Sequence, residues 1–161
     1  MEADRASDAL DWVRRTGKRK FNRANNELNP EQVALEARIL QKLGNKNDAQ
    51  SLRWRCFEAV LSPDVLRDYL KHLPDFEDFE AEGRAHKFAL AHSDRDAAMQ
   101  FFLAWPRHDL LADLIVAHRL YWDGRDWHIL PKIAALLEYE YPLAATILYR
   151  TLLDDILNRA R

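Results

Sequence analysis

Apolar residues recur along the chain at the spacing of amphipathic helices, and in most segments they occupy two sides of the helix. In residues 30–43, Val33 and Ala37 share one stripe, while Leu35 and Ile39 line a second. A helix that is apolar on two sides packs against two neighbours, whereas a lone surface helix needs one stripe. The predicted helices cover residues 3–15, 30–43, 47–61, 63–73, 75–91, 94–105, 108–121, 127–140 and 142–161.

The joints between these segments are short and carry recognisable boundary residues. Asn29 before Pro30 is an expected N-cap followed by a proline in the first helical turn, where no N–H is needed. Gly44 supplies a left-handed position at a helix end, and Asp123 to Asp126 (DGRD) form the clearest turn. Because the joints are short, we expect consecutive helices to run antiparallel.

The prolines recur at a nearly constant interval. Pro63 lies 33 positions after Pro30, Pro106 lies 32 after Pro74, and Pro142 lies 36 after Pro106. Hairpin repeats of the tetratricopeptide type have a period of about 34 residues. The predicted fold is therefore all-α, with antiparallel helical hairpins stacked as a short tetratricopeptide-like α-solenoid. An irregular globular all-α domain is the alternative.

The regularly spaced prolines begin at residue 30, which divides the chain into two predicted parts. We expect residues 1–29 to form an N-terminal helix and a basic linker, and residues 30–161 to form the helical-repeat domain. The last predicted helix carries the most regular apolar stripe. That stripe consists of Ala145, Leu148, Leu152 and Ile156.

Composition supports a helical, core-forming protein and excludes several classes. Of the 161 residues, 48% are apolar and 31% are charged, which suffices for a core and is too apolar for a disordered chain. Cys56 is the single cysteine, so a disulfide framework and a cysteine-based zinc or iron–sulfur site are excluded. The chain has neither an apolar run of membrane-spanning length nor a secretory signal pattern, and we expect a cytoplasmic protein.

A basic run interrupts this mildly acidic chain, whose formal net charge is −2. Its six cations could grip a phosphate backbone, with Phe21 as an interleaved aromatic residue. Two structural alternatives are a solvated linker and docking onto the chain's own acidic segment. The cations of the run are Arg14, Arg15, Lys18, Arg19, Lys20 and Arg23.

An acidic stretch, PDFEDFEAE, begins at Pro74 and opens the helix predicted over residues 75–91. Carboxylates at a helix start are favoured by the helix dipole, which explains them without a site. Phe76 and Phe79 are expected to pack in the core. The functional alternative is a partner's basic peptide lying along this face.

Residues that carry catalysis or bind metal do not form a known pattern. The six histidines contain no i, i+4 pair and no H-E-x-x-H motif, and no G-x-S-x-G elbow or glycine-rich phosphate loop occurs. Cys56 lies on an apolar stripe, where a thiol is normally inert. We therefore expect no enzyme, no cofactor and no bound metal, with an unrecognised enzyme as an alternative.

Four segments resemble a bacterial family of uncharacterised helical-repeat proteins, and the resemblance covers most of the chain from about Val13 onward. They are LEARILQKLGNKNDAQSLRWRCFEAVLS (Leu35 to Ser62), LPDFEDFEAE (Leu73 to Glu82), FFLAWP (Phe101 to Pro106) and YPLAATILYRTLLDDILNRAR (Tyr141 to Arg161). The resemblance implies a tetratricopeptide-like α-solenoid without an assigned reaction. Members of the family tend to be longer, so the chain resembles one segment of such a protein or a short version of it. In a longer member, Tyr149, Leu153 and Leu157 would be covered by further chain.

The expected function is a non-catalytic scaffold that binds a peptide or helix of a protein partner on a solenoid surface. Self-association through the terminal hairpin is compatible with it. A nucleic-acid-associated module is the rival, using Arg14 to Arg23 with further cations such as Arg53 and Arg55. The candidate polar positions for partner binding are Arg38, Gln41, Arg67, Lys71 and Arg107.

Overall fold

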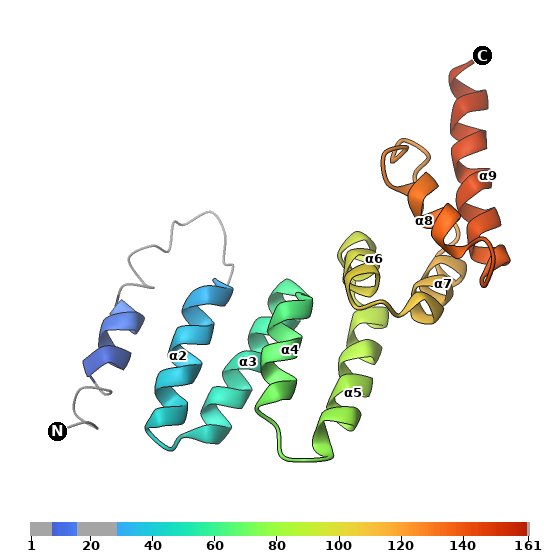
Figure 1. Cartoon of the computed structure of the whole chain (residues 1–161). Coiled ribbons are helices and arrows are strands. Elements are labelled where there is room, and N and C mark those ends of the chain that lie inside the picture. Colours follow the sequence, from blue (N-terminus) through green and yellow to red (C-terminus); the bar gives the residue numbers. More distant parts are fainter. Residues whose placement is uncertain (1–7, 16–28, 161) are drawn as a thin grey trace. The chain divides into compact units, whose positions relative to one another are not determined.

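A computed structural model describes residues 8–15 and 29–160, and over these ranges the chain is helical and contains no strand. It confirms the predicted all-α helical-repeat fold, in which α2–α3 and α4–α5 form antiparallel hairpins (Figure 1). A further helix covers residues 8–15. The helices are α2 (Pro30–Lys42), α3 (Lys46–Val60), α4 (Pro63–Lys71), α5 (Glu77–Ala91), α6 (Arg95–Ala104), α7 (His108–Ala117), α8 (Leu130–Leu137) and α9 (Pro142–Arg159).

The helices are grouped into two compact units, residues 1–91 and 92–161. In the first unit, α3 packs against both α2 and α4, and α4 packs against α5. In the second unit, α7 packs against α6 and α9, and α8 packs against α9. None of the helices in the described ranges is long and apolar enough to span a bilayer.

The start and end of α2 follow the boundary residues that the sequence predicts. Oδ1 of Asn29 accepts hydrogen bonds from the backbone N–H groups of Glu31 (3.0 Å) and Gln32 (3.5 Å), and Pro30 opens the helix. Gly44 follows the helix with a φ of 86°, which glycine adopts without the steric cost of a Cβ. The N-cap and the left-handed glycine are therefore confirmed.

The helix of residues 8–15 packs on α2. Val13 is buried, and its carbonyl accepts a hydrogen bond of 3.0 Å from Nε2 of Gln32. Leu10 rests on a small apolar cluster that includes Ala37. Residues 16–28 lie outside the described ranges, so the domain boundary at residue 29 stays a prediction.

The core of the second unit is formed mainly by leucine, isoleucine and phenylalanine. The largest fully buried side chains there are Phe101, Phe102, Leu111, Leu114, Ile115, Leu130, Ile133, Leu137 and Leu148. Two predicted helices in this unit are too long, since α7 ends at Ala117 and α8 covers only Leu130–Leu137. Pro131 explains the late start of α8, because proline is tolerated in a first turn and breaks a helix interior.

Candidate interaction surfaces

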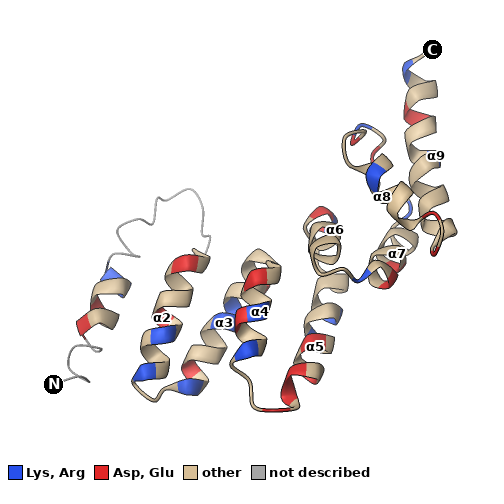
Figure 2. Cartoon of the chain, viewed as in Figure 1, with Lys and Arg blue, Asp and Glu red and all other residues tan. Residues whose placement is uncertain are grey.

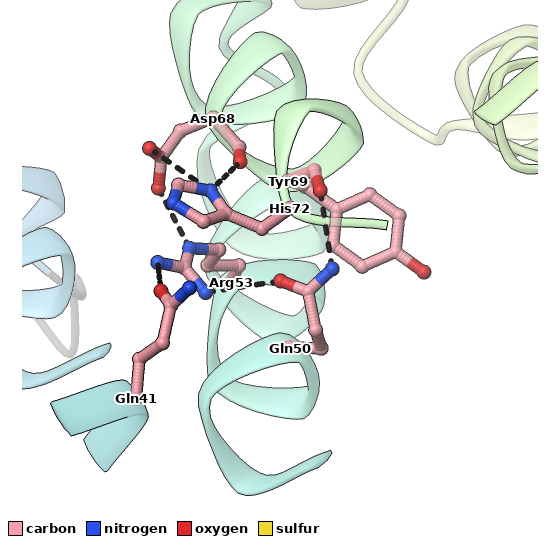
Figure 3. A network of polar contacts seen from close by, with 6 residues as sticks. All are labelled: Gln41, Gln50, Arg53, Asp68, Tyr69 and His72. Atoms are coloured by element: carbon pink, nitrogen blue, oxygen red, sulfur yellow. Dashed lines mark hydrogen bonds and ion pairs between the residues drawn. The ribbon is translucent and has the colours of Figure 1, made fainter. Parts of the chain in front are cut away.

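Arg53 lies at the centre of a polar network that joins three helices of the first unit (Figure 3). Its guanidinium donates from Nε to Oδ2 of Asp68 on α4 (2.7 Å), from Nη1 to Oε1 of Gln50 (3.0 Å) and from Nη2 to Oε1 of Gln41 on α2 (3.2 Å). Only 2% of the Arg53 side chain is exposed, whereas 41% of Asp68 is. A buried charge requires such partners, so the network holds α2, α3 and α4 together.

This network includes two residues that the sequence analysis named as candidates for binding. The nucleic-acid alternative needs Arg53 as a further cation beside the basic run, but Arg53 is buried and its side chain is bound by three partners. Gln41 was expected to be a partner-binding position, and its amide oxygen is engaged by Arg53. Arg53 lies on the buried side of α3, four residues after Ala49 and three before Cys56. The pattern of apolar positions missed the network because it counts only apolar residues, although this spacing was the signal that could have found it.

The basic run is only partly within the described residues. Nε of Arg14 donates to Oε1 of Glu36 on α2 at 2.8 Å, and Arg15 lies 3.9 Å from the carboxylate of Asp11. Arg14 is therefore already compensated by this chain's own acid. Four of the predicted contact residues, Lys18, Arg19, Lys20 and Arg23, lie outside the described ranges.

Four other cations were candidates for partner binding, and three of them are exposed, whereas Arg107 is partly buried and paired with Asp109. Arg38 lies on α2, while Arg67 and Lys71 lie one helical turn apart on α4. Nη1 of Arg67 contacts Oδ1 of Asp64 at 2.8 Å. The three exposed cations stay candidates through their exposure alone.

Groups that could support chemistry are few in the part of the chain that the structure covers. No cluster of three or more His, Cys, Asp or Glu side chains that could hold a metal ion occurs there. Burial raises the pKa of the Cys56 thiol, so the reactive thiolate is disfavoured. Asp109 has a pKa lowered to about 2 by its hydrogen bonds from Arg107, and the two groups form an exposed ion pair at the start of α7.

The acidic stretch differs from its prediction in one respect. Phe76 and Phe79 were expected in the core, but 94% and 85% of their surface is exposed. Both belong to the joint and first turn before the packed part of α5, whose buried residues begin at Ala81. The apolar periodicity of α5 therefore starts later than the sequence pattern suggested.

The outer side of α9 is a second exposed apolar surface. Leu153 lies four positions after Tyr149, and Ile156 and Leu157 lie three and four positions after Leu153, so the four side chains share one face, which we call the α9 face. The adjoining side of the helix, with Ala145 and Leu148, is buried in the unit. Half or more of Leu153, Ile156 and Leu157 is exposed.

Helix lengths explain why Ile156 departs from its predicted place on the buried stripe. The 18 residues of α9 span about 27 Å, whereas the 8 residues of α8 span about 12 Å. The last turns of α9 extend past α8 (Figure 1) and have no helix of the second unit to cover them. Ile156 there lines a shallow apolar groove with Trp127, Arg159 and Ala160.

Comparison with known proteins identifies a family for this chain. Searches of the curated proteins and of solved structures find no match to this chain. A family model does match, over residues 1–161, and its description is a family of unknown function, DUF6880. The expectation of an uncharacterised family is thereby confirmed, and the chain belongs to this family, DUF6880.

Proposed function

We propose that this protein is a non-catalytic protein–protein interaction module, and that the α9 face docks a helix of a protein partner. The observation that carries the proposal is the exposure of 54% of Leu153 and 60% of Ile156 on one continuous helix face. Contiguous apolar surface of this kind is uncommon on a monomer and marks interaction sites. Recognition of an amphipathic helix through apolar side chains that recur every three or four residues is a common mode of binding between proteins.

The energetic argument depends on how much apolar surface the partner would cover. Full burial of a leucine or isoleucine side chain stabilises by about 1.5–3 kcal/mol, and half of that remains to be gained where half is exposed. The three aliphatic side chains of the α9 face would then contribute a few kcal/mol. The aromatic ring of Trp127 beside Ile156 would add contact area of the type found at the centre of interfaces.

The rival functions have less support among the described residues. For a nucleic-acid module, Arg14 is paired with Glu36 and Arg53 is buried, which removes two of the expected cations. For an enzyme, the described residues contain no cluster of three or more His, Cys, Asp or Glu side chains that could hold a metal ion, and burial disfavours the reactive form of the Cys56 thiol. The proposal further includes tetratricopeptide-like stacking of the hairpins and a cytoplasmic location.

The proposal is tested by quantitative affinity capture from native cells with two matched variants. Leu153→Gln with Ile156→Gln removes apolar contact from the α9 face, and both positions are exposed enough for the fold to persist. Leu120→Gln with Tyr139→Gln makes the same chemical change at exposed positions outside α9. We expect at least one protein to be captured by the wild type and the control and to be lost with the α9 variant.

The same proteins distinguish a partner from self-association. Light scattering over a range of concentrations reports whether the wild type forms dimers that the α9 variant does not. A concentration-dependent dimer would mean that a second copy occupies the α9 face. Capture that is equal for all three proteins would contradict a docking role for this face.

A further inference from the structure

Phe76 occupies a turn position that is usually taken by glycine or asparagine. The N–H of Glu77 donates to the carbonyl of Pro74 at 3.2 Å, which closes a four-residue turn with Phe76 in the third position. There Phe76 has a φ of 71°, in the left-handed region. A turn with a positive φ at this position favours glycine or asparagine, and a side chain with a Cβ costs about 1–2 kcal/mol there.

No contact in the described part of the unit offsets that cost. Phe76 is 94% exposed, and Phe79, one turn further on, is 85% exposed, so neither ring gains appreciable burial. Glycine would suit the turn better, and alanine would suit the exposed helix position of Phe79 at least as well. Two phenylalanines that do not stabilise the folded chain are accounted for if a partner buries them.

The charges around the two rings indicate which partner fits. Between Pro74 and Gly83 the chain carries five acids and no Lys or Arg, and these acidic positions lie together along the joint and the start of α5 (Figure 2). Four of these acids are exposed and take part in no ion pair within the described residues. These four are Asp75, Glu77, Asp78 and Glu80.

The nearest arginine on α5 does not neutralise this surface. Nη2 of Arg84 donates to the hydroxyl of Tyr69 at 2.7 Å, and its guanidinium lies 4.4 Å from the centroid of the Trp54 ring. Arg84 is thus engaged by the aromatic cluster of the unit. The helix dipole accounts for acids in the first turn of α5, but Asp75 precedes the helix and the dipole gives no role to the rings.

We propose that Phe76 and Phe79 anchor a cationic polypeptide segment of a protein partner, whose apolar side chains cover the two rings and whose Lys and Arg side chains meet the surrounding carboxylates. Nucleic acids and anionic membranes carry the wrong charge for this surface. The site belongs to the first unit and stands independently of the α9 face. A negative result for this site therefore does not contradict the proposed docking on the α9 face, and the reverse also holds.

The test measures binding of fluorescent synthetic peptides to the full chain by anisotropy. The probe is a short peptide of lysine and leucine. Two comparison peptides each lack one of its features: a glutamine–leucine peptide has no charge, and oligolysine has no apolar side chain to cover the rings. We expect the lysine–leucine peptide to bind more tightly than either comparison peptide, and its affinity to fall as salt is raised, because both charge and apolar contact contribute.

Variants separate the anchoring role from nonspecific attraction to an acidic protein. Phe76→Gly and Phe79→Ala should each raise the dissociation constant by about tenfold, equivalent to about 1.4 kcal/mol. Phe76→Gly should leave the thermal midpoint unchanged or higher, so lost binding cannot be ascribed to lost folding. The matched control is Tyr139→Ala, which removes an equally exposed ring beside Glu140 in the second unit and should leave binding unchanged.

Each other outcome overturns the proposal. Binding that is unaffected by Phe76→Gly and Phe79→Ala, or weakened equally by Tyr139→Ala, would show that the rings are not anchors. Equal binding of oligolysine and the lysine–leucine peptide would show that the acidic surface attracts cations nonspecifically, without a contribution from the rings. A peptide of residues 12–23 of this chain that binds more tightly, with the same dependence on the rings, would identify the chain's own basic segment as the occupant.

Discussion

Arg53 and Asp68 form a salt bridge whose two ends differ sharply in their access to water. The guanidinium is almost fully buried, while the carboxylate, 2.7 Å away, is 41% exposed. Substitution of Asp68 leaves a buried Arg53 without its salt-bridge partner, whereas substitution of Arg53 leaves an Asp68 that water can reach. The two substitutions should therefore have unequal effects on stability.

Asp68→Ala should destabilise the first unit by about 3 kcal/mol, because it leaves a buried positive charge without its counter-charge. Arg53→Met should cost less, about 1–2 kcal/mol, because Asp68 can be hydrated and methionine fills much of the arginine's volume. Urea denaturation of both variants checks the order. A larger loss for Arg53→Met would contradict the role assigned to the buried guanidinium.

Gly124 and Gly83 should respond in opposite directions to the same substitution. A Cβ on Gly124 would collide with Cβ of Asp155 and would lie 2.6 Å from the carbonyl oxygen of Thr151, so the DGRD turn would be pushed away from α9. Gly83 lies in α5 with no atom in the way. Thermal denaturation should show Gly124→Ala destabilised by about 1–3 kcal/mol and Gly83→Ala stabilised by about 0.5–1 kcal/mol.

Trp122 is buried and donates from Nε1 to the carbonyl oxygen of Ile115 at 3.1 Å. That carbonyl belongs to the last turn of α7, where no intrahelical donor is available. Trp122→Phe removes the donor while keeping an aromatic ring, and should cost about 1–3 kcal/mol. Equal stability of the variant and the wild type in urea would show that the hydrogen bond contributes nothing.

Asp109 should titrate far below an ordinary aspartate. Hydrogen bonds from Arg107 lower its pKa from 3.8 to about 2 in the folded chain. Because the folded-state pKa is the lower one, the stabilisation is complete above about pH 3.8 and is lost as the pH falls towards 2. NMR titration of the Asp109 carboxyl should show this low value in the wild type and a value near 3.8 in Arg107→Gln.

The helices could be predicted from the sequence because their signals are local. The cap formed by Asn29, the proline at the start of α2 and the left-handed Gly44 each act within one turn, and all three appear in the structure. Apolar spacing likewise placed Cys56 in the core, where it is fully buried. The overhang of α9 is different, since it depends on the length of α8, which Pro131 shortens.

The candidate surfaces were harder to predict because they depend on which apolar side chains stay uncovered. Phe76 and Phe79 have the spacing of a core stripe, yet the turn at Pro74 keeps both rings out of the unit. Trp122 and Trp127 flank the same DGRD turn, and only Trp122 is buried, through its contact with α7. A single sequence does not encode these differences in local periodicity, because tertiary contacts decide them.

The most direct test of the proposed function is site-specific photo-cross-linking in native cells, with a photoreactive amino acid in place of Leu153. Matched proteins carry it at Ile156, on the same face, and at Glu140, which is exposed but off the face. We predict a defined adduct with another protein at positions 153 and 156 that is absent at position 140. The same adducts at all three positions, or adducts with nucleic acid alone, would contradict docking of a protein partner on α9.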